Sequence, residues 1–337
     1  MNALITGGAG FVGSNLAAYL MQRGERATVF DSLARQGATE NLAWLRGRGT
    51  VDFIHGDVRN AFDVEEAIKR VMPEAIFHLA GQVAMTTSIA NPRRDFEINV
   101  LGSINVLEAV RNYAPKTAVI YASSNKVYGN LEHLDLVEAA TRYQPRNATG
   151  VDEKTAIEFH TPYGCSKGAA DQYMLDYARG FGLNTVVFRH STIYGGRQFA
   201  TYDQGWVGWF CRQAIETKKH PARAPFTVSG DGKQVRDLLH VSDAVRAYVA
   251  AYQHIDTARG EAFNIGGGIE NSMSLLELLL FLEKRLEVKL NYTHLPWRQS
   301  DQKFFVADNG KAERLMQWSP ATTKEQGIED TLQWESR

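Results

Sequence analysis

Short apolar runs alternate with amphipathic stretches along most of the chain. The runs occupy residues 3–6, 27–30, 51–55, 75–81, 117–122, 184–188 and 262–265, and are typical of strands that are buried on both faces of a sheet. Apolar positions at helical spacing occur in residues 14–20, 63–71, 92–113, 242–252, 275–286 and 323–334. Strands and helices in strict turn predict an α/β fold, a doubly wound parallel sheet covered on both faces, with its site at the carboxyl ends of the strands.

The length of the chain adds a second part to this fold. A chain of 337 residues exceeds a typical single domain. We expect a nucleotide-binding domain in residues 1–188, which also receives 235–265, and a smaller, interleaved substrate-binding lobe in residues 189–337. Residues 130–161 are a long polar connection, and such a connection in a compact domain is typical of a functional segment. We therefore expect a partly ordered lid there.

The first predicted strand runs into a glycine loop. Gly7, Gly10 and Gly13 stand between strand and helix, a spacing that permits a tight turn and close approach of a pyrophosphate to the backbone. Asp31 ends the second strand, where a carboxylate accepts hydrogen bonds from an adenosine ribose and repels a 2′-phosphate. The alternative is a glycine-rich turn without a ligand. The pattern predicts a Rossmann-type domain that prefers NAD to NADP, with Arg35 as the one neighbouring residue that favours NADP.

Three later residues bring candidate chemistry to this domain. Of the thirteen tyrosines, only Tyr163 has a lysine four positions on, Lys167, which places both on one face of a helix. An ammonium beside a phenol favours its ionised form and makes it a base. Ser124 follows the fifth strand, where its hydroxyl would bond both the phenol and a substrate oxygen. The alternatives are a surface lysine beside a packed ring and a turn rich in Ser and Asn.

Composition and charge narrow the possible partners. Lys plus Arg number 37 and Asp plus Glu number 38, without a basic cluster, which argues against nucleic acid. Two cysteines build neither a disulfide framework nor a cysteine zinc site, so we predict no metal and a reducing compartment. The chain begins without the features of a signal peptide and has no apolar run of about 18 residues, so we expect a cytoplasmic protein without a membrane partner.

Taken in order, these features resemble one enzyme family. The glycine loop, Asp31, Asp57-Val58, residues 78–81, Ser124 before residues 127–129, and the Tyr163–Lys167 pair resemble the extended short-chain dehydrogenases/reductases of the nucleotide-sugar epimerase and dehydratase group. The resemblance implies NAD as the cofactor. It implies that the cofactor-binding residues are Gly7, Gly10, Phe11, Val12, Gly13, Asp31, Asp57, Val58, Leu79, Ala80, Gly81, Asn99, Tyr163 and Lys167.

The resemblance also indicates a reaction and a substrate. Residues 78–91, 160–177 and 189–210 are most similar to the members of the group that epimerise C2 of a CDP-linked sugar. The implied reaction is NAD-dependent: transient oxidation to a 2-keto sugar with Ser124, Tyr163 and Lys167 as catalytic residues, followed by return of the hydride to the other face. The implied substrate-binding residues are Gln82, Asn125, Thr192, Arg197, Gln198, Phe199, Gln204, Arg236, Arg298 and Asp301. The helices at 92–113 and from 163 onward resemble those that pair in dimers of the group, which implies a homodimer or tetramer.

One local difference argues against dehydration. Dehydratases of the group carry an Asp-Glu pair where this chain has Asn125 and Lys126. An amide is neither an acid nor a base, and one lysine does not readily serve as both. Epimerisation of a UDP-sugar at C4 and reduction of a 4-keto sugar remain as alternatives, and a non-catalytic NAD-binding regulatory protein is an alternative of another class. Thr192 stands where many relatives have a phosphate-binding asparagine.

Overall fold

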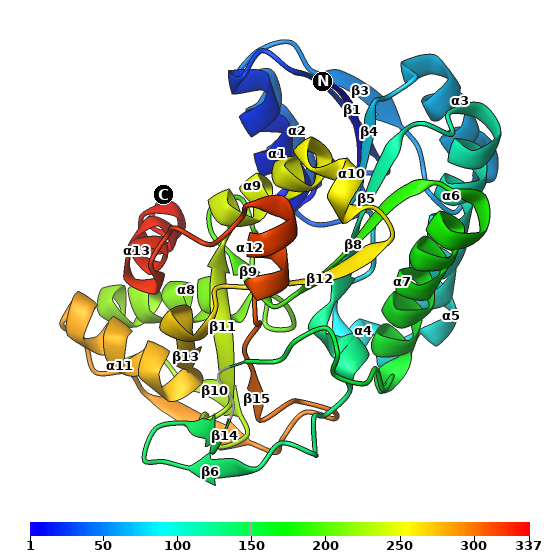
Figure 1. The fold of residues 1–337 in the computed structure, drawn as a ribbon. Coiled ribbons are helices and arrows are strands. Elements are labelled where there is room, and N and C mark those ends of the chain that lie inside the picture. Colours follow the sequence, from blue (N-terminus) through cyan, green and yellow to red (C-terminus); the bar gives the residue numbers. More distant parts are fainter. Residues whose placement is uncertain (148–149) are drawn as a thin grey trace.

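A computed structural model of the chain describes residues 1–147 and 150–337, and its centre is a parallel sheet (Figure 1). The sheet has seven strands in the order β12-β8-β5-β4-β1-β2-β3. Their bounds are Asn2–Thr6 (β1), Arg26–Asp31 (β2), Asp52–His55 (β3), Ala75–His78 (β4), Ala118–Ser124 (β5), Asn184–His190 (β8) and Glu261–Ile265 (β12). The predicted doubly wound α/β fold is confirmed, because consecutive strands run outward from β1 in both directions and leave a crevice between β1 and β4.

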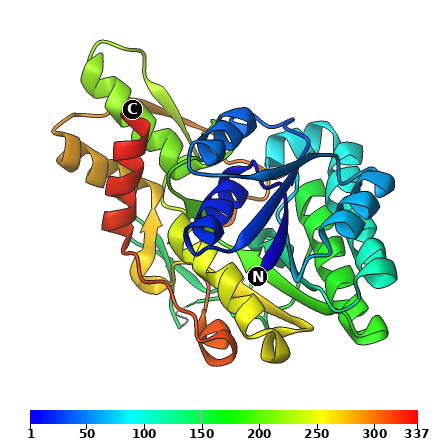
Figure 2. The ribbon, with the colours of Figure 1, turned by 90° about the horizontal axis from the view of Figure 1, so that it is seen from above.

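Helices cover both faces of the sheet, as the two views show (Figures 1 and 2). On one face lie α1 (Phe11–Gln22), α2 (Ala38–Arg46), α9 (Val241–Gln253) and, late in the chain, α12 (Gly310–Met316). On the other lie α3 (Ala61–Val71), α6 (Gly102–Tyr113) and α7 (Thr161–Phe181). Alternate residues of the strands feed two separate apolar cores; Ile5 packs in the first and Leu4 in the second. This explains why the strands read as unbroken apolar runs.

A smaller lobe packs beside the carboxyl end of the sheet. Its strands are β9 (Thr192–Tyr194), β10 (Phe226–Ser229), β11 (Val235–His240), β13 (Ser272–Ser274), β14 (Tyr292–Leu295) and β15 (Phe304–Phe305), and its helices are α8 (Trp206–Lys219), α11 (Leu275–Leu286) and α13 (Lys324–Glu335). The lobe has its own core around Phe210, Leu278 and Ile328. The chain leaves it after β11 to build α9, the short α10 (Ile255–Ala258) and β12, and leaves it again to build α12. Two parts therefore interleave along one chain.

One predicted helix is broken in the structure. The sequence predicts a single helix over residues 92–113, but they form α5 (Pro92–Phe96), a π-helical turn (Glu97–Leu101) and then α6. The wider turn places Asn99 inside the protein, where its side chain bonds both backbone polar groups of Gln82. Short π-helical segments of this kind occur frequently at functional sites. The predicted strand 75–81 likewise ends at His78, after which the chain passes close to the glycine loop.

The expected lid is also corrected by the structure. Residues 136–138 (β6) and 143–145 (β7) pair as a hairpin docked on the lobe, where Arg142 binds the Glu277 carboxylate at 2.7 Å. Val151 then pairs with Ala307. None of the described residues of the 130–161 segment lines the pocket described below, so this part of the connection is no lid; residues 148 and 149 lie outside the described residues. Within the ranges that the structure describes, no helix is long and apolar enough to span a membrane.

Two histidines are buried in the sheet. His78 lies between the hydroxyls of Thr6, at 2.7 Å, and Ser103, at 3.0 Å. His190 is bonded to the hydroxyl of Tyr248 at 2.7 Å. Burial lowers the pKa of each histidine from 6.5 to about 3, so both are neutral in the folded protein over the whole physiological range.

These histidines predict a loss of stability in mild acid. Between pH 6.5 and about 3 the unfolded chain binds a proton on each histidine and the folded chain does not, so stability falls as the pH falls. The expected slope is about 1.4 kcal/mol per pH unit for each histidine. Urea unfolding at several pH values would measure it. His78→Gln should remove its share of the slope, whereas His220→Gln, on the exposed surface, should leave the slope unchanged; equal slopes for both variants would contradict the prediction.

Candidate active site

The glycine loop between β1 and α1 is closed against its neighbours. Gly7 has φ +69°, and a Cβ there would lie 2.7 Å from the amide nitrogen of Ala80. A Cβ on Gly13 would overlap the carbonyl oxygen of Gly7. Phe11 and Val12 open α1, so their backbone amides lie at the positive end of the helix dipole. The glycine loop is packed so closely that it has no room for side chains at these positions. A loop of this kind lets a pyrophosphate approach the main-chain N–H groups.

Two carboxylates follow the neighbouring strands. Asp31 accepts hydrogen bonds from the amides of Ala9, at 3.0 Å, and Leu33, at 2.7 Å, which hold it beside the glycine loop. Burial raises the pKa of Asp31, so ligand hydroxyls that donate to it would relieve an unfavourable desolvation. Asp57 binds the Arg59 guanidinium at 2.6 Å, and this pairing lowers the pKa of Asp57.

Together these residues fit a dinucleotide. The glycine loop, the start of α1 and Asp31 occupy the places that hold the pyrophosphate and the ribose of NAD in folds of this kind. Val58 packs under Gly102, and Leu79, Ala80 and Gly81 pass between the loop and Lys167. Asn99 lies behind this segment. The structure thus brings the predicted cofactor-binding residues to one edge of the sheet, although Asn99 uses its side chain on protein partners.

The three candidate catalytic residues come from two elements. Ser124 is the last residue of β5, and Tyr163 and Lys167 lie on the first turns of α7. A bidentate ion pair between Asp171 of α7 and Arg189 of β8, at 2.9 and 3.0 Å, fixes the helix to the sheet. The three residues are buried, with Lys167 only 2% exposed.

The hydrogen bond of Lys167 goes to the backbone and not to the phenol of Tyr163. Its ammonium donates to the carbonyl oxygen of Ala122 at 2.9 Å and lies 5.0 Å from the centre of the Tyr121 ring. Burial lowers the pKa of Lys167 to about 8, and the nearby Asp95 raises it. Burial raises the pKa of Tyr163 to about 12, and the nearby Ser124 lowers it, while the Ser124 hydroxyl itself donates to the side chain of Asn125 at 3.3 Å.

A buried polar network behind the catalytic helix was not expected. Asp95 accepts hydrogen bonds from Gln82, at 2.8 Å, and Ser166, at 2.9 Å, and Asn99 donates to the same Ser166 hydroxyl. The network ties α5 and the π-helical turn to the helix that carries Tyr163. The sequence held one signal for it, an aspartate and an asparagine in an otherwise amphipathic helix.

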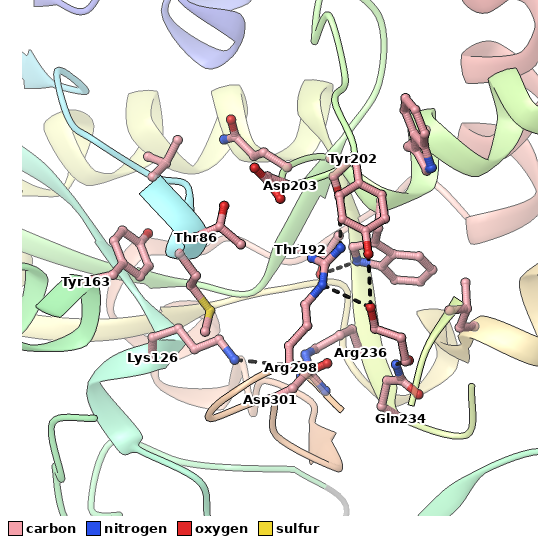
Figure 3. A pocket seen from close by; sticks show the side chains of 18 of the residues that line it. Thr86, Lys126, Tyr163, Thr192, Tyr202, Asp203, Gln234, Arg236, Arg298 and Asp301 are labelled. Carbon is pink, nitrogen blue, oxygen red and sulfur yellow. Dashed lines mark hydrogen bonds and ion pairs between the residues drawn. The ribbon is translucent and has the colours of Figure 1, made fainter. Parts of the chain in front are cut away.

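A cavity of about 390 Å³ lies in front of Ser124 and Tyr163, between the sheet and the lobe (Figure 3). Ten of its lining residues are labelled in the figure. Of the predicted substrate-binding residues, the structure brings together Asn125, Thr192, Gln204, Arg236, Arg298 and Asp301. Residues that were not predicted singly also line it. Val83, Met85, Thr86 and Ile89 lie at the helix α4 (Met85–Ala90), within the stretch 78–91 whose similarity indicated the substrate, and Tyr202 lies within the stretch 189–210; Lys126 and Ser229 complete this group.

The remaining predicted residues lie outside this lining. Arg197 bonds the side chain of Asn41 on α2 and lies 4.6 Å from the ring centre of Trp334 on α13. Phe199 packs against the same Trp334, and Gln198 donates to the carbonyl oxygen of Ile193. The segment 197–199 therefore joins the two parts of the protein instead of entering the cavity. The side-chain amide of Gln82 forms its hydrogen bonds with the Asp95 carboxylate and with the backbone of Ala84.

Basic side chains gather at one wall of the cavity. Arg236 binds Asp301 at 2.7 Å, and Arg298 donates to the carbonyl oxygen of Tyr202 at 3.0 Å while it lies over that ring. Thr192 accepts a hydrogen bond from the indole of Trp206. A guanidinium pair of this kind suits the oxygens of a diphosphate.

Comparison with known proteins identifies the family. The model of the NAD dependent epimerase/dehydratase family matches residues 3–266. The chain belongs to this family. A CDP-paratose 2-epimerase from Salmonella typhi is 56% identical over 337 residues, covering 100% of this chain and 99% of that protein. A putative UDP-glucose 4-epimerase from Methanocaldococcus jannaschii is 29% identical, covering 98% of this chain and 97% of that protein.

Solved structures of the family agree with the fold. The UDP-glucose 4-epimerase of Thermus thermophilus, solved in complex with NAD, has a TM-score of 0.83 at 27% identity, covering 100% of this chain and 99% of that chain. The UDP-glucose 4-epimerase of Thermotoga maritima, solved with UDP-glucose, has a TM-score of 0.84 at 28% identity, covering 99% and 98%. The predictions of an enzyme of this group and of NAD as its cofactor are thereby confirmed.

Gly13→Ala should abolish retention of NAD. The added methyl would collide with the Gly7 carbonyl oxygen and force the loop open. Absorbance of the nucleotide released on denaturation measures the occupancy. Gly180→Ala is the matched control, because Gly180 lies on the exposed surface of α7 with nothing within 4 Å of the new Cβ; it should retain NAD and gain about 0.5–1 kcal/mol of stability. Normal NAD content in Gly13→Ala would disprove the assigned role.

Proposed function

We propose that this enzyme epimerises C2 of a CDP-linked sugar and interconverts CDP-paratose and CDP-tyvelose. The observation that carries the proposal is that Ser124 and Tyr163 lie at one end of a cavity. The two residues that follow Ser124, Asn125 and Lys126, do not supply the acid and the base that elimination of water requires. The CDP-paratose 2-epimerase relative, similar over the whole chain, supports the choice of base and carbon. CDP-glucose and CDP-mannose form a second substrate pair for the same chemistry.

The side chains at this end of the cavity divide the proton chemistry between them. Ser124 donates to the oxygen on C2 and holds it at Tyr163, whose phenol oxygen accepts the hydroxyl proton and later gives it back. Lys167, mostly an ammonium at neutral pH, holds positive charge behind the reacting atoms. NAD, when bound, supplies the acceptor and donor of the hydride that leaves C2 and returns to it. Residues of the glycine loop and Asp31 hold the cofactor.

Epimerisation also requires that the keto sugar present its other face. Arg236 and Arg298 bind the diphosphate and keep the nucleotide in place while the sugar turns. The part of the lining that α4 forms is largely apolar, with Met85 and Ile89, so it offers the turning ring few hydrogen bonds to break. The arginines thus hold the nucleotide by its charge, and the apolar lining leaves the sugar free to turn.

We propose further that the enzyme is a homodimer or tetramer and works in the cytoplasm. Apolar side chains stand exposed on α5, the π-helical turn and α7, among them Phe96 at 56%, Leu101 and Tyr173. A patch of this kind favours burial against a second copy. Both cysteines, Cys165 and Cys211, are free thiols, as in a reducing compartment.

The reaction is tested by incubation with CDP-paratose, CDP-glucose and UDP-glucose in heavy water, followed by NMR of the products. We expect the C2 epimer of a CDP-sugar without deuterium at C2, because the hydride that leaves is the one that returns. Tyr163→Phe should lower turnover by about a hundredfold to ten-thousandfold and still contain NAD. Deuterium at C2 would refute hydride return, and a C4 epimer of UDP-glucose as the only product would replace the proposed function.

The assembly is tested by light scattering on the eluting enzyme. We expect the mass of a dimer or tetramer. Phe96→Asp places a charge in the proposed interface and should shift the mass toward the monomer. Leu280→Asp is the control, since Leu280 is 54% exposed on α11, away from this surface, and should leave the mass unchanged. A monomeric wild-type enzyme would refute the proposal.

A further inference from the structure

Lys126 enters the cavity two residues after the catalytic Ser124. Its ammonium donates to the carbonyl oxygen of Ser300 at 3.2 Å and lies 3.8 Å from a carboxylate oxygen of Asp301. An ammonium has three N–H groups, so it has donors left for a ligand. Its side chain is only 14% exposed, and burial lowers the pKa of Lys126 to about 8. An anion beside this desolvated charge would relieve the cost of its burial.

A purely structural role for Lys126 would be to hold the loop at residues 298–302 against the end of β5, but the neighbouring Asn125 already does this. Asn125 donates to the side chain of Gln302 at 2.9 Å, and Gln302 donates back to the carbonyl oxygens of Asn125 and Gly129. These bonds fasten the loop at residues 298–302 to the end of β5. A lysine is not required to hold that loop in place.

The charges around Lys126 favour an anion. Three cations, Lys126, Arg236 and Arg298, line the same cavity, and the carboxylate among them, Asp301, is bound to Arg236. Figure 3 shows Lys126 between Tyr163 and this group, with its amine toward Asp301. The other carboxylate of the lining, Asp203, follows Tyr202, whose carbonyl oxygen accepts the hydrogen bond from Arg298, so three cations face two carboxylates in this lining. The surplus positive charge suits a diphosphate, and Lys126 continues it from the two arginines toward Ser124.

The chemistry of a C2 reaction explains a cation in this place. In a nucleotide sugar the diphosphate is attached to C1, and C2 is the carbon beside it. An enzyme that oxidises C2 must therefore bring the sugar-proximal phosphate close to its serine and tyrosine. An enzyme that oxidises C4, across the ring, holds that phosphate farther away and has no use for a cation beside the serine.

We propose that Lys126 contacts the substrate: its ammonium binds the sugar-proximal phosphate and thereby sets C2, and not C4, against Ser124 and Tyr163. This inference rests on the proposed C2 epimerisation. It adds a residue that determines which carbon reacts, at the position where dehydratases of the group carry a carboxylate that a phosphate would repel.

The test is calorimetric titration of the NAD-loaded enzyme with CDP and with CMP. CDP carries the phosphate in question and CMP lacks it. Lys126→Met should weaken CDP binding by about 10- to 100-fold, as expected for loss of a charge-assisted hydrogen bond, and leave CMP binding unchanged. Lys126→Arg, which keeps the charge, should restore most of the CDP affinity. Lys233→Met, which removes a lysine outside the cavity, should change neither.

Equal losses for CDP and CMP, or no loss for either, would overturn the role of Lys126. Because the titration needs no turnover, it separates this inference from the proposed function. Normal CDP binding by Lys126→Met in an enzyme that does epimerise a CDP-sugar at C2 would overturn the phosphate contact alone. Selective loss of CDP binding in an enzyme without C2 activity would overturn the proposed function and retain the contact.

Discussion

The buried ion pair between Asp171 and Arg189 is the constraint on which the active site depends. Asp171 also accepts a hydrogen bond from Ser123, next to the catalytic serine, and Arg189 donates to Tyr128, which donates in turn to Asn264 of β12. A buried charge without its partner costs several kcal/mol, so neither residue tolerates displacement. Through these bonds the base-bearing helix, the serine strand and the outer strand of the sheet are held in one fixed arrangement.

The walls of the cavity beside this rigid centre differ in charge. The cavity wall that carries Arg236 and Arg298 is cationic, and these arginines are bound to the Asp301 carboxylate and to the carbonyl oxygen of Tyr202. The wall formed by α4 is mostly apolar. Tyr163 stands at the boundary, where burial opposes ionisation and the Ser124 hydroxyl assists it.

Local patterns in the sequence predicted the strands and the glycine loop well, because each is signalled by consecutive or closely spaced residues. The predicted apolar runs end within one or two residues of the ends of six of the seven strands, and the three glycines stand within seven residues of one another. What failed depends on tertiary contacts. The helix at 92–113 breaks because Asn99 reaches Gln82, and the 197–199 segment turns away from the cavity because Trp334, far along the chain, stacks on Arg197. Spacing along a sequence carries no trace of such partners.

The interleaving of the two parts has a consequence for how such an enzyme changes its substrate. The lobe is assembled from separate stretches, and the chain returns to the sheet for α9 and β12 and again for α12. The lobe is not one continuous segment of the chain, so it cannot be exchanged by recombination at a single position. Exchange of a long segment would replace parts of the sheet and of the lobe together and disturb the packing of both cores. New specificity is therefore accessible mainly through individual substitutions along the cavity, on a scaffold that is inherited intact.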